Sequence, residues 1–257
     1  MNCPAPAVRR ACGPGSAASA ADAAVTLREV GGTTIEHVGG FLGRLDPGGR
    51  SEVLQLGHQR RYRRGARIIV EGDRSDTVFV VLEGRVKVTN DTPEGREIVL
   101  SVLGPGNLVG EFEALDGTDD PRTASNVALE PVECRMIPAV EFLAFLEACP
   151  RRPMAVLQEI VHRLRAADRR RSAATSLDTG HRLAAFLLEM HDDHGRTGSE
   201  GTAIDVPLTQ EELASLIAAS RDSVVRALSW LRRQGLVTTE RRRIVVRDLA
   251  GLRRYAG

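Results

Sequence analysis

Residues 208–237 read LTQEELASLIAASRDSVVRALSWLRRQGLV and carry the signals of two short helices in succession. Thr209 is followed three residues later by Glu212, which is the capping-box spacing of a helix start. Ser220 is a second N-cap residue, and Gly235 is the residue type that commonly ends a helix. Two short helices joined by about three residues predict a helix-turn-helix unit.

The segment that follows predicts a basic β-hairpin, because residues 236–248 read LVTTERRRIVVRD and place Arg241, Arg242 and Arg243 at the expected tip. Residues 205–257 contain ten arginines against six acidic residues, a local balance of +4 in a chain whose formal net charge is +1. A basic module in a near-neutral chain fits a surface that faces phosphates, so we expect a winged helix-turn-helix that binds double-stranded DNA. The alternative is a solvated pair of charged helices.

The second predicted helix begins with side chains suited to reading bases. Arg221, Asp222 and Arg226 share one face of this helix, at spacings of one and four residues. Arginine can pair bidentately with guanine, and aspartate can accept a hydrogen bond from cytosine. The full set of expected DNA contacts is Thr209, Gln210, Ser220, Arg221, Asp222, Arg226 and Arg242.

Short strands punctuated by glycine precede this module. RIIVEGD at 67–73, DTVFVVLEGRVKV at 76–88 and REIVLSVL at 96–103 read as strands, with a turn at 91–95. Such spacing favours a β-barrel or sandwich that ends near Pro138. A short helical segment is expected over residues 41–56.

A coiled-coil spacing follows the predicted barrel. Its positions, at alternating steps of three and four residues, are Leu157, Ile160, Leu164, Ala167, Arg171 and Ala174. Most of the remaining circumference is expected to be a polar outer surface, which favours a narrow seam between two copies of the chain. Its arginines are Arg163, Arg165, Arg169 and Arg170. The alternative is a core helix packed on the chain's own barrel.

Residues 1–37 are rich in Ala, Gly, Pro and Ser, and we expect a disordered leader there. The chain has no run of 18 apolar residues and no secretory signal core, so it is expected in the cytoplasm, without a membrane partner. The spacing of Cys3 and Cys12 is too loose for the usual metal or iron–sulfur sites, and we predict no metal site. No nucleophile elbow, P-loop or HExxH motif is present, so no enzymatic activity is predicted.

The run Ser-Arg-Asp-Ser-Val-Val-Arg at 220–226 resembles the start of the recognition helix in the cyclic-AMP receptor protein / fumarate–nitrate regulator (Crp/Fnr) family, where Ser-Arg-Glu-Thr-Val-x-Arg is typical. Two positions depart from the family pattern. Asp222 replaces the usual Glu, and Ala218 stands at the turn where Gly is common. The first departure bears on the base preference of the helix, and the second bears on the conformation of the turn.

Residues 108–129, LVGEFEALDGTDDPRTASNVAL, resemble the phosphate-binding cassette of cyclic-nucleotide domains. By this resemblance, Gly110 allows close backbone approach, while Arg122 and Thr123 bind the phosphate. Glu111 matches the carboxylate that accepts from the ribose 2′-hydroxyl. Where the cyclic-AMP receptor protein has a Thr-Ser pair at the adenine, this chain has Ala167 and Asp168, of which Asp168 can accept from an exocyclic amine.

The resemblance implies an α+β chain. Its expected parts are a disordered leader (1–37), a cyclic-nucleotide-binding-like jelly-roll barrel (38–149), a dimerisation helix (150–176) and a winged helix-turn-helix (177–257). It implies a homodimeric transcription regulator of a palindromic DNA site, with cyclic AMP or a related nucleotide as effector and RNA polymerase as a partner if it activates. The alternative is regulation without a nucleotide, by a redox or haem signal or constitutively.

Overall fold

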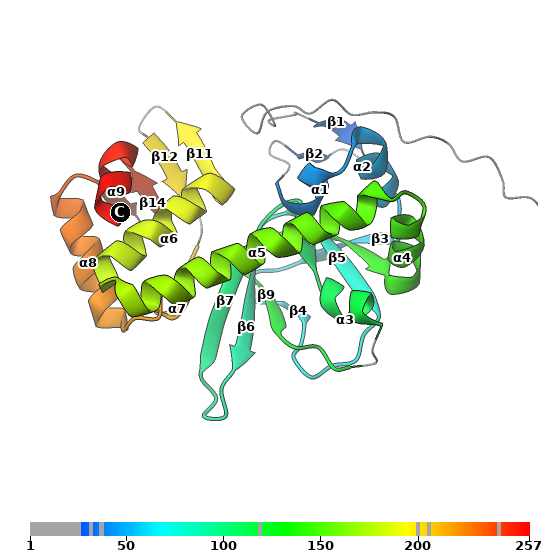
Figure 1. The fold of residues 1–257 in the computed structure, drawn as a ribbon, viewed down its shortest axis with the longest axis horizontal. Coiled ribbons are helices and arrows are strands. Elements are labelled where there is room, and N and C mark those ends of the chain that lie inside the picture. Colours follow the sequence, from blue (N-terminus) through cyan, green and yellow to red (C-terminus); the bar gives the residue numbers. More distant parts are fainter. Residues whose placement is uncertain are drawn as a thin grey trace, which may run out of the picture.

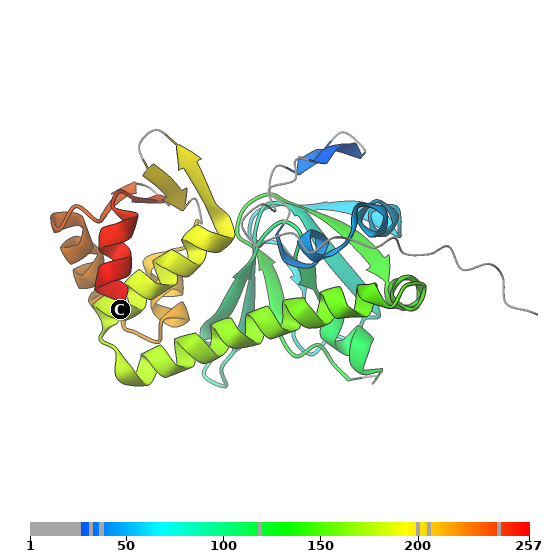
Figure 2. The ribbon, with the colours of Figure 1, turned by 45° about the horizontal axis from the view of Figure 1, so that its top comes forward.

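The computed structural model describes residues 27–30, 33–35, 39–117, 120–198, 201–204, 207–240 and 243–257. Figures 1 and 2 show a β-barrel domain and a C-terminal domain at opposite ends of the molecule, joined by one long helix. Antiparallel sheets and helices occur together along the chain, which confirms the predicted α+β class.

The barrel consists of two four-stranded antiparallel sheets, ordered β3-β10-β5-β8 and β4-β9-β6-β7. Their strands are β3 (His58–Tyr62), β4 (Arg67–Ile69), β5 (Thr77–Glu83), β6 (Val86–Asp91), β7 (Glu97–Leu103), β8 (Leu108–Val109), β9 (Ser125–Ala128) and β10 (Val132–Pro138). The apolar run of β5 does not alternate with polar residues because both faces are covered. Val78 and Val80 pack in one core cluster, and Phe79 and Val81 pack in another.

Short helices pack against the barrel. They are α1 (Gly40–Arg44), α2 (Pro47–Val53), α3 (Glu111–Asp116) and α4 (Ala139–Glu147), and each contributes to the core cluster that contains Val78 and Val80. The helical segment expected over 41–56 is divided into α1 and α2, and Pro47 occupies the first position of the second helix. This is the helix position at which proline is best tolerated, because its missing N–H would have no partner there.

The long helix α5 (Arg151–Ser176) packs one face on the barrel and exposes another. Ala155 and Val156 lie in the barrel's core cluster, and Ile160 packs against that cluster. Met154 and Leu157 are each 50% exposed, and Leu164 is 58% exposed. Of the positions predicted for the seam, Leu157 and Leu164 are exposed, whereas Ile160 packs on the barrel. Met154, which was not among the predicted positions, is exposed as well.

The C-terminal domain combines four helices with a small sheet. Its elements are α6 (Thr179–His194), β11 (Gly195–Gly198), β12 (Gly201–Ile204), α7 (Gln210–Leu216), α8 (Arg221–Arg233), β13 (Val237–Glu240), β14 (Arg243–Val246) and α9 (Leu249–Ala256). The sheet order is β11-β12-β14-β13. The pairing of β11 with β12 adds a second hairpin beside the one that the sequence predicted. The hairpin β13–β14 is the predicted wing.

The C-terminal domain is packed against strand β7 of the barrel. Val99 and Val102 share a core cluster with Leu213 and Leu216 of α7, and the N–H of Val99 donates to Ser215 Oγ at 2.8 Å. Lys87 Nζ lies 2.7 Å from Glu212 Oε1 and also pairs with Glu97. Burial alone would lower the pKa of Lys87, but the hydrogen bonds and charges of both glutamates outweigh it and raise the pKa.

Part of the predicted leader is paired. β1 (Leu27–Val30) and β2 (Thr33–Ile35) form an antiparallel hairpin, where disordered chain was expected. The sequence signal is Gly31-Gly32 between two segments that contain β-branched residues, which composition alone overlooks. The rest of the leader lies outside the described residues. No helix in the described part of the chain is long and apolar enough to span a bilayer.

Candidate functional site

The first helix of the helix-turn-helix, α7, begins with the predicted capping box. The N–H of Glu212 donates to Thr209 Oγ1 at 3.2 Å, and the N–H of Thr209 donates to Glu212 Oε2 at 2.7 Å. The other carboxylate oxygen of Glu212 forms an ion pair with Lys87, so this one side chain both caps the start of α7 and attaches the helix to the barrel. Burial would raise the pKa of Glu212, but Lys87 and the Thr209 N–H outweigh it and lower the pKa.

The turn between α7 and α8 is set by Ala218. Its φ is +52°, and it is the one non-glycine residue with positive φ among the residues that the structure describes. Arg182 Nη1 donates to the Ala218 carbonyl at 2.9 Å, and the N–H of Ala219 donates to the Ala214 carbonyl at 2.9 Å. Ala218, which stands where glycine is common in the family, therefore adopts a left-handed conformation, and hydrogen bonds of the turn stabilise it.

The second helix, α8, has one buried and one exposed face. Its N-cap is Ser220, whose Oγ accepts from the N–H of Ser223 at 3.2 Å. The buried residues are Val224, Leu228 and Leu231, which pack into the domain core. The exposed residues in the first two turns are Arg221, Asp222, Val225 and Arg226. The structure thus brings three of the predicted base-reading side chains together on the outward face.

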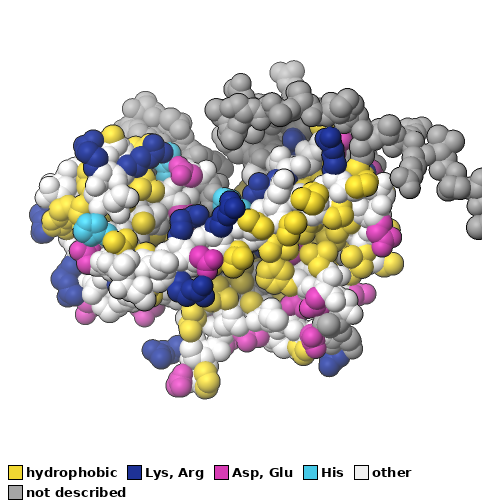
Figure 3. Space-filling model, in the orientation of Figure 1, with side chains coloured by type: hydrophobic (Ala, Val, Ile, Leu, Met, Phe, Trp, Pro, Cys, Tyr) yellow, Lys and Arg dark blue, Asp and Glu magenta, His cyan; other side chains and the backbone are white. Residues whose placement is uncertain are grey.

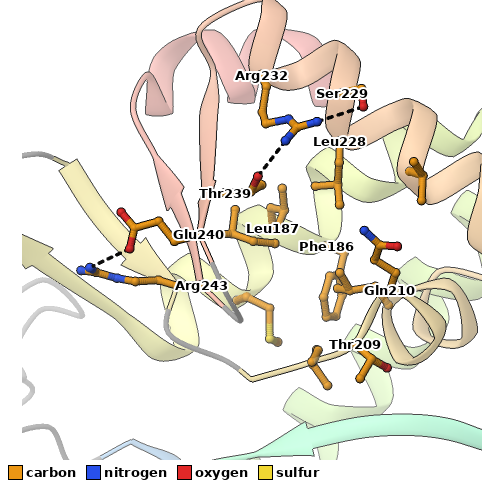
Figure 4. A pocket seen from close by; sticks show the side chains of 15 residues that line it. Phe186, Leu187, Thr209, Gln210, Leu228, Ser229, Arg232, Thr239, Glu240 and Arg243 are labelled. Carbon is orange, nitrogen blue, oxygen red and sulfur yellow. Dashed lines mark hydrogen bonds and ion pairs between the residues drawn. The ribbon is translucent and has the colours of Figure 1, made fainter.

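A groove lies beside this face, between α6, α7, α8 and the wing (Figure 4). Thr209 and Gln210 line it from the start of α7, and Arg232 lines it from α8. Arg232 donates to Ser229 Oγ at 3.1 Å and to Thr239 Oγ1 of the wing at 3.2 Å. Sequence reasoning did not select Arg232, although its position three residues after Ser229 places both side chains on the same side of α8.

The wing contributes Arg243 to the same groove. Arg243 lies 3.6 Å from Glu240, and both residues line the groove (Figure 4). Arg242, the predicted wing contact, lies outside the described residues. The start of α7, α8 and the wing therefore each contribute polar or basic side chains to one groove, whose remaining lining is largely apolar. Those polar and basic groups suit a phosphate backbone beside a major groove.

The predicted effector cassette is centred on Arg122, whose side chain is only 2% exposed. Its Nη1 donates to the Gly110 carbonyl at 2.7 Å and to Glu113 Oε2 at 2.8 Å, and its Nη2 donates to the Thr77 carbonyl at 2.6 Å. Gly110 has φ +75°, and a Cβ there would lie 2.9 Å from Arg122 Nη1. Glycine is required at this position because any side chain would meet the guanidinium.

Glu113 is the residue of the cassette that sequence reasoning missed. Besides Arg122, it binds Thr123, whose N–H and Oγ1 donate to Glu113 Oε1 at 3.0 and 3.2 Å. Burial would raise the pKa of Glu113, but the Thr123 N–H, its own backbone N–H and Arg122 outweigh it and lower the pKa. A sequence signal existed in the second carboxylate of GEFE, two residues after Glu111.

Glu111 faces the long helix. It is 3% exposed, and its Oε1 lies 2.6 Å from Arg163 Nη1. Arg163 also donates to Glu159 at 3.0 Å and to the Leu108 carbonyl at 2.7 Å. This arginine, which the sequence placed on a polar outer surface, therefore connects α5 to the cassette. Asp168 lies further along α5, where it is exposed and pairs with Arg171 at 2.8 Å.

A barrel with this cassette, joined by one helix to a winged helix-turn-helix, defines a transcription regulator. Two family models match: the cyclic nucleotide-binding domain over residues 59–149 and the Crp-like helix-turn-helix domain over residues 181–255. The transcriptional regulator LdrP of Thermus thermophilus is 32% identical over 206 residues, covering 77% of this chain and 96% of that protein. The chain belongs to the Crp/Fnr family of transcription regulators.

Other relatives agree with this assignment. The CRP-like cAMP-activated global transcriptional regulator of Mycobacterium tuberculosis is 28% identical over 193 residues, covering 75% of this chain and 85% of that protein. The crystal structure of a CRP-family transcriptional regulator from Thermus thermophilus matches with a TM-score of 0.64 and 26% identity, covering 77% of this chain and 96% of that one.

The strained turn generates a stability prediction for Ala218→Gly. A left-handed conformation costs a non-glycine residue roughly 1–2 kcal/mol, and glycine removes this strain. Glycine also makes the unfolded chain more flexible, which lowers the free energy of unfolding by roughly 0.5–1 kcal/mol. We expect Ala218→Gly to raise the free energy of unfolding by about 0.5–1 kcal/mol in urea denaturation. The control is Ala219→Gly, where φ is not positive and a loss of stability is expected. An equal loss of stability in both variants would contradict backbone strain at Ala218.

Proposed function

We propose that this regulator acts as a homodimer that binds a palindromic DNA site through one α8 helix per half-site. The observation that carries the proposal is the joint exposure of Arg221, Asp222 and Arg226 in the first two turns of α8, whose opposite face is buried. Arginine fits the major-groove edge of guanine, and the polar and basic side chains in the groove beside α8 suit the adjoining phosphates. Further contacts are proposed on the phosphate side and at the wing, from Thr209, Gln210, Ser220 and Arg242.

The proposed dimer surface is the outward face of α5. Figure 3 shows hydrophobic side chains gathered along this helix and beside it. Met154, Leu157 and Leu164 are at least half exposed, and Phe112 of α3, in the cassette beside α5, is 51% exposed. A second copy is the occupant that this face fits, because its exposed apolar residues lie on one side of α5 at steps of three and seven residues, and a two-fold arrangement would pair identical stripes.

The barrel is proposed to hold the effector. The cassette of Gly110, Glu111, Arg122 and Thr123 has the donor and acceptor types that a cyclic nucleotide requires, and relatives such as the Mycobacterium tuberculosis protein are named as cAMP-activated. Cyclic AMP or a related nucleotide is the proposed ligand, with Asp168 near the base. An effector in this position would bias two arrangements of the dimer, since Arg163 connects the cassette to the helix that carries the seam.

A second candidate is regulation without a nucleotide. It is favoured by Ala167, which cannot hydrogen-bond a base, and by the pairing of Asp168 with Arg171. In either case we expect the protein to act in the cytoplasm, where the DNA is, and to contact RNA polymerase if it activates transcription.

The proposed seam is tested by replacing Leu157 and Leu164 with Glu. The pair would place four charges in the dimer interface, and we expect a monomer because unpaired buried charges are strongly unfavourable. Multi-angle light scattering measures the mass directly. The matched control is Arg165→Glu with Arg169→Glu, two exposed residues of the same helix outside the seam, which should stay dimeric. An intact dimer in the leucine variant would contradict the seam.

The proposed DNA site is tested by selection from random duplexes. We expect a palindrome with guanine in each half-site and half-sites roughly 34–36 Å apart. Arg226→Ala should cost about 1–3 kcal/mol and relax the base preference at one position per half-site. Arg242→Ala should weaken all sequences alike and reduce the salt dependence.

Fluorescence anisotropy at two salt concentrations separates these two effects. The control is Arg254→Ala, an exposed arginine of α9 that lies beside Asp248 rather than on α8 or the wing. An Arg226→Ala protein with unchanged base preference would show that α8 is not the reading helix.

A further inference from the structure

The donors of the cassette already bind an anion that belongs to the chain. Arg122 Nη1 and both donors of Thr123 converge on the carboxylate of Glu113, at 2.8, 3.0 and 3.2 Å. A guanidinium, a hydroxyl and a backbone N–H are the groups that also bind a phosphate anion. The carboxylate of Glu113 therefore has the charge and the partners that the cassette would offer to a nucleotide phosphate.

This contact is well protected from solvent. The side chains of Arg122 and Glu113 are 2% and 10% exposed, so the pair is shielded from the water and salt that weaken surface ion pairs. Breaking the pair without a replacement would leave the Arg122 charge buried and unpaired, which is strongly unfavourable. A ligand can separate the two residues only if it supplies an anion to Arg122 in exchange.

The carboxylate does not use every donor of Arg122. The Nε of Arg122 is buried and has no hydrogen-bond partner among the residues that the structure describes. The phosphate of a cyclic nucleotide has two exocyclic oxygens, as a carboxylate does, but they are arranged tetrahedrally about phosphorus together with two ester oxygens. A phosphate can therefore offer acceptors in more directions than the planar carboxylate, including toward this Nε–H. The site is therefore occupied by an internal anion, while one donor of Arg122 is left without a partner.

We propose that Glu113 is a built-in competitor for the phosphate position, so that a cyclic nucleotide must displace this carboxylate from Arg122 and Thr123 in order to bind. The proposal rests on the effector role proposed for the cassette and deepens it. The regulator would respond only to a high nucleotide concentration, since part of the binding energy is used to displace Glu113.

The test is calorimetric titration of the full-length protein with cyclic AMP and, separately, with cyclic GMP. We expect Glu113→Ala to bind at least one of the two nucleotides about ten- to a hundredfold more tightly than the wild-type protein, the range that corresponds to a charge-assisted hydrogen bond. Glu113→Gln keeps the size of the side chain and removes its charge, so it should also bind more tightly. Asp116→Ala removes an exposed carboxylate from the same helix and should behave as the wild-type protein does.

Thermal unfolding shows whether each variant is folded. Glu113→Ala should unfold at a lower temperature than the wild-type protein and regain stability with nucleotide, because Arg122 recovers an anion. Wild-type protein that binds as tightly as both Glu113 variants would overturn the proposal, and so would folded variants that bind neither nucleotide.

DNA binding separates this proposal from the proposed function. Absence of specific DNA binding by the wild-type protein would refute the proposed DNA site and leave the comparison between Glu113 variants intact. Conversely, specific DNA binding together with equal nucleotide affinities would refute only the role of Glu113.

Discussion

The ion pairs made by the carboxylates of α3 are the interactions on which the effector domain depends. Two carboxylates of one short helix are largely removed from water, and each requires a cation. Glu111 forms an ion pair with Arg163 of α5, and Glu113 forms one with Arg122, which lies in the segment before β9. The first pair attaches the long helix to the barrel, and the second occupies the donors that we propose for a nucleotide phosphate. The charges of one short helix thus bear on the architecture and, in our proposal, on the ligand chemistry.

The position of α5 then determines the rest of the molecule. Because Arg163 and Ile160 hold one face on the barrel, the stripe of Met154, Leu157 and Leu164 is left outward. The end of α5 leads directly into α6 and the DNA-binding domain (Figure 1). That domain is attached to the barrel a second time through Lys87 and Glu212. A change at the cassette can therefore reach α8 by two connections, one through α5 and one through the first helix of the helix-turn-helix.

Local signals predicted most of the DNA-binding end. The capping box of Thr209, the Ser220 cap and the turn at Ala218 depend on neighbours in sequence, so they were visible without the fold. The cassette was recognised as a pattern, but its pairings were not predicted. Arg122 with Glu113 and Glu111 with Arg163 depend on how a loop and a distant helix pack around α3. The polar outer surface expected at Arg163 was wrong for the same reason, since a buried carboxylate required this cation.

The most direct test is an NMR titration of the Glu113 carboxyl carbon in protein labelled at glutamate, with Glu113→Gln used for assignment. If Arg122 and Thr123 bind this carboxylate, its pKa lies below the ordinary glutamate value of 4.5, since their attraction outweighs burial. In Arg122→Met the pKa should rise, because burial then acts with less opposition. A Glu113 carboxyl that titrates at the ordinary value in both proteins would contradict the internal anion.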